Sequence, residues 1–513
     1  MANEFDQFFN SGGKGNQVDD LEQSLGHIWE ISKEFGLEPC PTHFELVPAH
    51  KIYEIGSYGL PVRFSHWSYG RAYRQMKTMY DHGLSKIYEV VINSNPAQGY
   101  LLDNNDSAAN KMVLAHVLAH VDFFTNSNVF KPTPKDMPQT AALSAERIRG
   151  YGLEVGENEV ERYLDSCLTI EEHIDPDEKN FYRLPKDRQI TAWREEDKEK
   201  RRKAEKPKTE YDDVFNIGQT QEKLIIPDNI TIPYHPDRDL LHIIREYSPV
   251  IKDWQKDVLD IVRSESIYFR PQMRTKIMNE GWATFWHKRI MREMGRRGHI
   301  SPAEQEGWWT LHAGVVHPNP KHINPYYVGM TIFDYLEDYY NGKIEDEEKR
   351  WLESERLPIY PEYNGPIEDS PGRKKIRSIM KTEDDQGFLR NHFDKIACDR
   401  TATYIYEREE IEGEIRYVVK EKDWKIIREV LVQSQNNSGY PYLEVTDCEY
   451  YGKHELHISH LYEGRELDSD YIKKTLPHIF RLWGRPVHLQ TTFKDRKVEY
   501  VFDGDDIDVS YVS

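Results

Sequence analysis

The chain has 513 residues, of which 38% are hydrophobic and 12% aromatic, enough apolar material for about two or three packed domains. Its formal net charge of −20 argues against general nucleic-acid binding, because phosphate recognition requires a basic surface. We find no signal peptide and no apolar run of about 18 residues, so we expect a cytoplasmic protein that does not insert into a membrane. The four cysteines show no CxxC spacing, which indicates neither a zinc knuckle nor a disulfide framework.

The N-terminal part of the chain predicts helices and a small sheet. Residues 1–17 are typical of a flexible tail, and apolar residues at helical spacing predict a helix over 18–36. Residues 84–105 predict two strands joined by a short turn. Residues 107–127 are apolar almost all round, which is typical of a buried helix.

The second half of the chain changes character twice. A mixed-charge run near 190–215 is typical of a solvated insertion, and helical periodicity returns across 239–295. A Pro/Gly-rich stretch at 360–378 indicates a domain boundary, after which strands and helices alternate. We therefore expect an α+β protein with a mainly helical core domain at 18–370, which includes a small sheet, and a C-terminal α+β domain at 376–513.

The buried helix at 107–127 carries a pair of histidines. His116 and His120 lie four residues apart, so their imidazoles project from one helical face and can chelate one zinc ion. With 21 histidines in the chain, roughly one HxxxH pair is expected by chance, and a hydrogen-bonded structural pair is the alternative. The apolar surroundings favour a metal, because two buried imidazoles need partners.

A second motif, MNEGWATFWH, places a carboxylate among aromatic residues. Glu280 and His287 lie on one face of the predicted helix. A buried carboxylate requires a cation, a network of donors or a raised pKa. A metal on the histidine pair would supply the cation. The alternatives are an ion pair with Arg274 or Lys276, or a cap at a helix start.

Together the two motifs resemble the gluzincin metallopeptidases, in which one helix carries HExxH and a later helix carries Asn-Glu-Gly-aromatic-Ala. HVLAH matches the two histidines and NEGWA matches the later motif. The resemblance implies a zincin-like core with zinc on His116, His120 and Glu280. The glutamate of HExxH would fall at Val117, which cannot act as a base. The stretch between the two motifs is also far longer than those peptidases usually have.

With Val117 in that position, a base for an activated water must come from another residue. The candidates for the base are Glu45, His43, Asp122 and His287. The candidates for stabilising an oxyanion are His312 and Tyr327. A structural hydrogen bond is the alternative for each, and Glu45, His287 and Tyr327 are the predicted catalytic residues.

A wider resemblance covers nearly the whole chain. Six blocks occur in the same order as in the stage V sporulation protein R (SpoVR-like) family: VRFSHWSYG, YEVVINSNPAQGYLL, AHVLAHVDFF, MNEGWATFWH, NPYYVG and HIFRLWG. The resemblance implies a bacterial or archaeal cytoplasmic protein, linked in spore formers to the spore cortex, a peptidoglycan layer. Family gene context implies a serine protein kinase and a von Willebrand-type domain protein as partners. The resemblance brings no settled reaction.

Three functions are compatible with these residues. The first is a metal-dependent hydrolase of a peptide or amide bond, which the polar and aromatic loops favour. The second is a non-catalytic scaffold or regulator with a structural metal, which Val117 favours. The third is a di-metal carboxylate oxygenase that adds Glu161 and Asp165 to the histidine pair. Asp165 is alternatively a hydrogen-bond partner that orients a ligand histidine.

Overall fold

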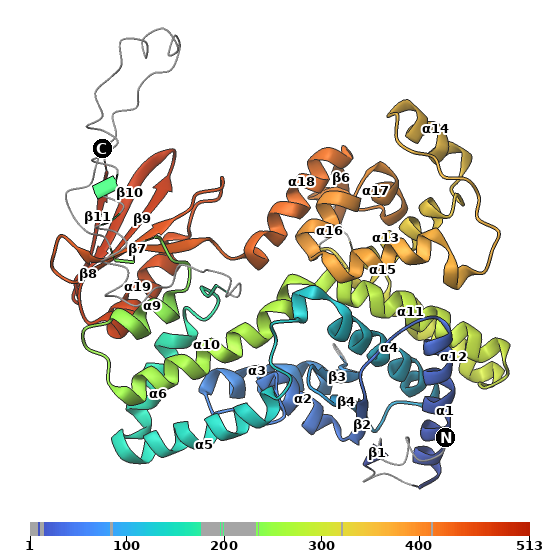
Figure 1. Cartoon of the computed structure of the whole chain (residues 1–513), viewed down its shortest axis with the longest axis horizontal. Helices are drawn as coiled ribbons and strands as arrows, with labels where there is room; N and C mark the ends of the chain where they lie inside the picture. Colours follow the sequence, from blue (N-terminus) through green and yellow to red (C-terminus); the bar gives the residue numbers. More distant parts are fainter. Residues whose placement is uncertain are drawn as a thin grey trace. The chain divides into compact units, whose positions relative to one another are not determined.

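The structure is a computed structural model of the chain (Figure 1). It describes residues 9–10, 15–82, 86–175, 195, 198–199, 232–233, 235–319, 322–411 and 414–512. The chain divides into two compact units, and each is made of two separate stretches of sequence. The first unit comprises Met1–Arg149 and Tyr268–Gly439, and the second comprises Gly150–Ile267 and Tyr440–Ser513.

The predicted α+β class is confirmed, with a mainly helical first unit that contains a small sheet. The helices of the first unit are α1 (Gly15–Glu34), α2 (Ala49–Tyr58), α3 (Trp67–Asp81), α4 (Ser107–Asn126), η1 (Asn128–Phe130), α11 (Lys276–Arg296), α12 (Pro302–Val315), α13 (Pro325–Tyr340), α14 (Asp346–Ser354), η2 (Ile367–Asp369), α15 (Pro371–Thr382), α16 (Asp385–His392), α17 (Lys395–Thr401), α18 (Trp424–Gln435) and η3 (Asn436–Gly439). The chain passes between the units within α5 (Met137–Val155) and α10 (Asp253–Arg274).

The sheet of the first unit has the order β1-β2-β4-β3 among the described residues. Its strands are β1 (Phe9–Asn10), β2 (Thr42–Val47), β3 (Glu89–Ile92) and β4 (Ala97–Leu102). β4 runs parallel to β2 and antiparallel to β3, which places β3 at an edge. The two strands expected in 84–105 and the buried helix expected at 107–127 are therefore confirmed. Most of the tail expected at 1–17, and nearly all of the insertion expected near 190–215, lie outside the described residues.

Helix α4 is buried all round because every side of it is covered. It packs against the sheet, α1, α11 and α12 (Figure 1). Val117 faces the sheet, where Gly99 permits close approach: a Cβ on Gly99 would lie 3.1 Å from Cγ1 of Val117 and 2.9 Å from the ring of Phe44. Position 117 therefore belongs to the packing between helix and sheet. The two histidines of α4 point elsewhere.

Helices α11 and α13 make the closest helix contact around the site. Gly281 of the NEGWA motif meets Gly329 of NPYYVG, and a Cβ on Gly281 would lie 2.8 Å from the backbone nitrogen of Met330 and closer still to Gly329. Only glycine allows the two backbones to approach in this way. The contact fixes the position of Glu280, which is the next residue along α11.

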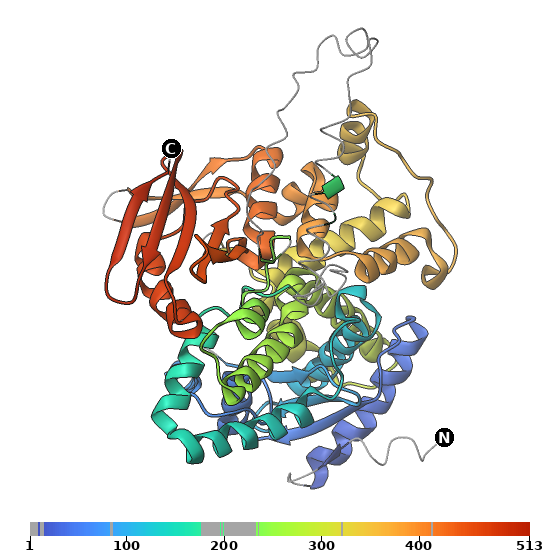
Figure 2. The ribbon, with the colours of Figure 1, turned by 60° about the vertical axis from the view of Figure 1, so that its left-hand side comes forward.

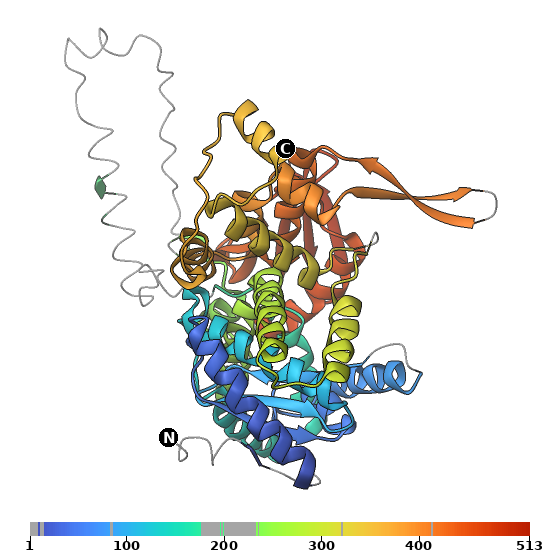
Figure 3. The same cartoon turned by 90° about the vertical axis from the view of Figure 1, so that its right-hand side faces the viewer.

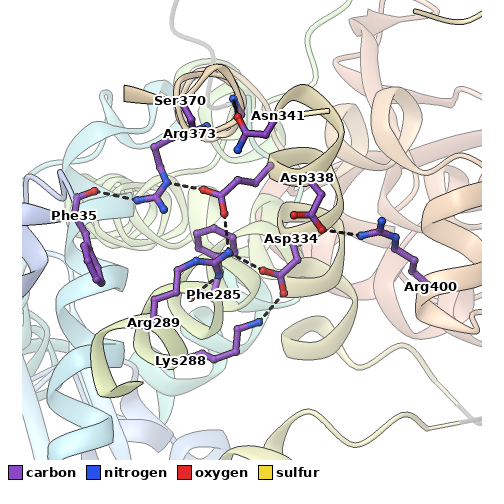
Figure 4. A network of polar contacts seen from close by, with 12 residues as sticks. Phe35, Phe285, Lys288, Arg289, Asp334, Asp338, Asn341, Ser370, Arg373 and Arg400 are labelled. Carbon is purple, nitrogen blue, oxygen red and sulfur yellow. Dashed lines mark hydrogen bonds and ion pairs between the residues drawn. The ribbon is translucent and has the colours of Figure 1, made fainter. Parts of the chain in front are cut away.

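Charged side chains reinforce the same pair of helices on another side (Figure 4). Glu337 of α13 accepts from Arg289 of α11 at 2.7 Å and from Arg373 of α15 at 2.6 Å. Asp334, one turn earlier on α13, pairs with Lys288 at 2.6 Å and with Arg289 at 2.9 Å. Because each buried acid has basic partners, the network ties α11, α13 and α15 together without leaving an unpaired charge.

Residues 376–439, expected to begin the C-terminal domain, lie in the first unit. Asp385 explains part of this placement, because its carboxyl group accepts the backbone N–H groups of Ile277 and Met278, each at 2.8 Å, and so caps α11. Apolar side chains of α16, α17 and α18 also join the core that contains α4 and α11. The strands β5 (Ile405–Ile411) and β6 (Glu414–Glu421) form a separate hairpin that extends away from these helices (Figure 3).

The second unit contains a five-stranded sheet of order β11-β10-β9-β8-β7, shown in red in Figure 2. Its elements are α6 (Glu157–Leu168), α9 (Leu240–Tyr247), β7 (Leu443–Tyr450), β8 (Glu455–His460), α19 (Ser469–Trp483), β9 (Val487–Phe493), β10 (Arg496–Phe502) and β11 (Ile507–Tyr511). The β8–β9 pair is parallel, and α19 packs against β9 and β10 through an apolar face. In neither unit does a described helix combine the length and apolar character that a membrane span requires.

Candidate metal centre

The predicted triad comes together inside the first unit. Helix α4 presents His116 and His120 from successive turns, and α11 presents Glu280. The Nε2 atoms of the two histidines are 3.0 Å apart, and the Oε2 atom of Glu280 lies 3.6 and 3.4 Å from them. Tetrahedral zinc with ligands at about 2.0–2.1 Å requires ligand atoms about 3.3 Å apart. The three atoms therefore have the spacing of one face of a metal site.

The hydrogen bonds and ion pairs of Glu280 also support a metal site. Its Oε2 atom is buried and has no hydrogen-bond partner, and the distances to the imidazoles are longer than strong hydrogen bonds. Arg274, one of the alternative partners, pairs instead with Asp384 at 2.9 Å. Burial alone would raise the pKa of Glu280, but the charge of His120 and contacts with both imidazoles hold it well below its usual range. An ionised carboxylate beside two imidazole nitrogens is a suitable donor set for a divalent cation.

A hydrogen-bonded chain of side chains orients the two imidazoles from behind. The Nδ1 atom of His120 lies 2.9 Å from Oδ1 of Asn279, the first residue of NEGWA. The Nδ1 atom of His116 lies 2.9 Å from Nδ1 of His287, and Nε2 of His287 lies 2.8 Å from Nδ1 of His312 on α12. Partners of this kind behind a ligand histidine fix the ring and its tautomer.

Both histidines of this hydrogen-bonded series that lie behind the ligands, His287 and His312, have lowered pKa values and are therefore neutral. Burial, together with the neighbouring imidazoles, keeps the pKa of His287 well below its usual range. Burial and the charge of Lys288 lower the pKa of His312 to about 4. In this geometry His287 hydrogen-bonds to the ligand His116, and His312 hydrogen-bonds to His287. His287 also reaches the wall of a pocket beside the triad.

That pocket has a volume of about 380 Å³ and opens on the His116 side of the triad. It is lined by Lys86, Tyr88, Glu89, Met112, Val113, His116, His287, Val315, His317, Asn319, His322, Ile323, Asn324, Pro325 and Tyr326. A pocket of this size, mostly apolar with a few convergent polar groups, is typical of a small-molecule site.

Two polar residues of the pocket were not predicted from the sequence. Glu89 opens the edge strand β3, and burial raises its pKa above the usual range, although the nearby His116 and His120 act in the opposite direction. Burial and the negative charges of Glu280 and Glu89 raise the pKa of Tyr326 far above its usual range, so its phenol stays protonated. The ring of Tyr326 stacks on His116 at a centroid distance of 6.0 Å. No local pattern around Glu89 marks it. Tyr326 does have a local signal. It lies three residues before Gly329 on the same helix, α13, and therefore on the face of α13 that packs against α11.

The other predicted site residues lie away from the pocket walls. Glu45 and His43 lie on β2, in register with Tyr100 and Gln98 of β4. The hydroxyl of Tyr327 donates to the carbonyl oxygen of Arg400 at 3.1 Å. Tyr326, the preceding residue, lines the pocket instead.

Asp122, a further candidate for the base, is occupied by structural hydrogen bonds. Its carboxyl group accepts from the backbone N–H of Glu38 at 2.7 Å and from Nε1 of Trp282 at 2.9 Å. These bonds join α4 to α11 and to the segment after α1, which is a packing role.

The candidates for a second metal, Glu161 and Asp165, lie on α6 of the second unit. Within that unit the charge of Asp165 acts on His478 of α19. Among the described residues, His116, His120 and Glu280 form the one group of three or more potential ligands close enough to share an ion.

Comparison with known proteins identifies the family. A model described as SpoVR like protein matches residues 15–440, and one described as SpoVR-like C-terminal domain matches residues 441–494. The chain therefore belongs to the SpoVR-like family. The uncharacterized protein YcgB of Escherichia coli (strain K12) is 26% identical over 504 residues, which cover 95% of each chain. No solved structure matches. The boundary between the two family models, at residues 440–441, lies one residue from the last crossing between the structural units, at residues 439–440.

Proposed function

We propose that this protein is a metal-dependent hydrolase of an amide bond, with zinc held by His116, His120 and Glu280. The observation that carries the proposal is the pocket beside the triad, which places Glu89 and Tyr326 around an open side of the site. A structural zinc site is closed by a fourth protein ligand, whereas a catalytic site has three protein ligands and an open position. Two histidines and one glutamate are a donor set that zinc hydrolases use.

Glu89 is the proposed proton carrier. A bound zinc ion supplies a Lewis acid that polarises a carbonyl group and makes water more acidic. Glu89 accepts a proton from the attacking water and returns it to the leaving nitrogen. Its raised pKa makes the Glu89 carboxylate a stronger proton acceptor than an ordinary exposed glutamate. Overall, the C–N bond breaks, a C–O bond forms from water, and the products are a carboxylate and an amine.

Tyr326 is the proposed donor to the developing oxyanion. Its phenol remains protonated because its pKa is raised, and it faces the pocket beside His116. A preorganised hydroxyl donor in a buried site stabilises the negative charge that builds on the carbonyl oxygen during attack.

The edge of the sheet thus supplies the carboxylate that α4 lacks. Val117 packs against the sheet at Gly99, so a glutamate at position 117 would point into the contact between helix and sheet. Glu89 comes from β3 of the same sheet and reaches the pocket directly. The valine at position 117 is therefore compatible with hydrolysis.

Substitution of Glu89 tests the proposal against a purely structural metal. We expect Glu89→Gln to retain its metal and to lose amide hydrolysis about 10²–10⁴-fold, since a general acid–base contributes that much. The assay is a screen of the zinc-loaded full-length chain against short peptides and N-acyl amides. Glu45→Gln is the matched control, because Glu45 lies on the same sheet and does not line the pocket.

Two results of this screen would contradict the proposal. One is a wild-type chain that binds zinc and hydrolyses no amide. The other is Glu89→Gln with unchanged activity. Either result would favour the scaffold or regulator function, in which the metal only stabilises the fold.

The cellular setting is proposed from the family resemblance. We place the protein in the cytoplasm, with a serine protein kinase and a von Willebrand-type domain protein as partners, and we link it in spore formers to the peptidoglycan of the cortex. Peptidoglycan contains amide bonds, which agrees with the proposed reaction. Purification of the tagged full-length chain from its native cells tests the partners, and the absence of both proteins would contradict them.

A further inference from the structure

We propose that the substrate of this site is a short amide that carries a carboxylate, and that Lys86 at the outer end of the pocket recognises this group. The inference rests on the proposed hydrolase. It concerns the part of the pocket that lies beyond Glu89 and Tyr326, which the proposed reaction does not use.

Lys86 has no acidic partner among the residues that the structure describes. Its Nζ atom lies 5.0 Å from the ring centroid of Tyr88, which holds it by a cation–π interaction. Within the described part of the chain it makes no ion pair, although the protein has 88 acidic residues and a net charge of −20. A lysine in the wall of a pocket, on so acidic a protein, is free to pair with an anion brought by a ligand.

The distance along the chain sets the length of that ligand. Lys86 precedes Glu89 by three residues, and the carbonyl of Tyr88 accepts the N–H of Leu102 at 3.2 Å, which continues the pairing of β3 with β4. Three residues span at most about 10 Å even in fully extended chain, so the Cα atoms of Lys86 and Glu89 are no further apart than this. The carboxylate therefore lies within about one to three residues of the amide bond that is cleaved.

Part of the pocket wall is apolar. Met112 and Val113 lie one turn before His116 on α4, and Val315 and Ile323 come from the other side. An aliphatic chain or side chain fits between them, because water released from this wall favours binding. The volume of about 380 Å³ is near the lower end of the range for ligand pockets, which suits a short substrate.

Asn324 holds in place the part of the pocket wall next to α12 and α13. Its side-chain nitrogen donates to the carbonyl oxygens of Val315 at 2.8 Å and His317 at 3.0 Å, and its Oδ1 atom caps α13. His317 and His322 also line the pocket, where an imidazole N–H can donate a hydrogen bond to a carboxylate. Cleavage of such a substrate consumes one water and gives two fragments, of which at least one keeps the carboxylate.

Paired hydroxamates test this inference without knowledge of the substrate. The probes are aliphatic dicarboxylic acid monohydroxamates of increasing length and the methyl ester of each. The hydroxamate group binds the metal, so affinity for the zinc-loaded full-length chain is measured by calorimetry. We expect one length of acid to bind about tenfold more tightly than its ester, which corresponds to about 1.4 kcal/mol. The preference should weaken with salt.

Variants assign the effect to Lys86. Lys86→Met should remove the preference for the acid and leave the affinity of the ester unchanged. Lys51→Met, a lysine on α2 that pairs with Glu54, should keep the preference. Esters that bind as well as acids to the wild type would overturn the inference, as would a preference that survives in Lys86→Met. If the chain binds zinc but no hydroxamate, the metal has no open position for a ligand, and this result would contradict the proposed function as well.

Discussion

At the scale of single residues, metal binding depends on which nitrogen of each imidazole carries the proton. The Nδ1 atom of His120 faces the carbonyl oxygen of Asn279, so this nitrogen must carry hydrogen and Nε2 is free for a metal. If His116 also binds through Nε2, its Nδ1–H donates to His287, and His287 in turn donates from Nε2 to His312. One metal therefore sets the tautomers of a chain of four histidines.

The protonation of His120 leads to a prediction about pH. Burial lowers the pKa of His120, but the charge of Glu280 and the contact with Asn279 outweigh burial and raise it above 6.5. In the metal-free protein His120 thus holds a proton that must leave before Nε2 can bind a metal. We expect the apparent zinc affinity to fall about tenfold per pH unit once the pH drops below this raised pKa, and to level off above it.

Competition with a chelator, at a series of pH values, measures this dependence. Asn279→Ala removes one of the contacts that raise the pKa, so its curve should shift to lower pH. A zinc affinity that does not change between about pH 5.5 and pH 8 would show that His120 is not a ligand.

At the scale of elements, the contact between α11 and α13 holds Glu280 in place. Gly281 and Gly329 meet backbone to backbone, and the side chains that flank them come from the two most specific motifs, NEGWA and NPYYVG. The buried network of Glu337, Arg289 and Arg373 supports the same helices further along (Figure 4). The carboxylate ligand is therefore positioned by packing as well as by its own helix.

Addition of a single methyl group tests this packing. We expect Gly281→Ala to force α11 and α13 apart, to destabilise the protein by about 1–3 kcal/mol, and to weaken metal binding because Glu280 moves. Thermal unfolding and metal content measure the two effects. Gly26→Ala is the matched control, since a Cβ at this helical position meets no atom within 4 Å and alanine favours the helix. Normal stability and metal content in Gly281→Ala would contradict the account.

At the scale of the whole molecule, the interleaving of the two units explains the long gap between the two halves of the metal motif. His120 and Glu280 both belong to the first unit, whereas the described residues within 150–267 belong, with those of 440–513, to the second unit. The distance in sequence therefore reflects an inserted stretch. The metal ligands themselves are supplied by helices α4 and α11, which pack directly against each other.

The features that the sequence makes visible are those with a local pattern. Helix α4 follows from its apolar run, and the triad follows from HVLAH and NEGWA, in which spacing and residue type are both visible. Glu89 reaches the pocket only through the tertiary fold, so no window of sequence marks it. Tyr326 lies inside NPYYVG, but the motif does not show which of its two tyrosines lines the pocket. The same holds for residues 376–439, whose strands and helices are visible but whose packing against α11 is not.

The metal content of the purified full-length chain tests the central claim most directly. After equilibration with zinc and removal of free metal, elemental analysis should find about one zinc per wild-type chain and about one in Glu89→Gln. It should find almost none in Glu280→Ala or in the double variant His116→Ala with His120→Ala. A wild-type chain without zinc, or full zinc content in Glu280→Ala and in the double histidine variant, would contradict the metal centre proposed here.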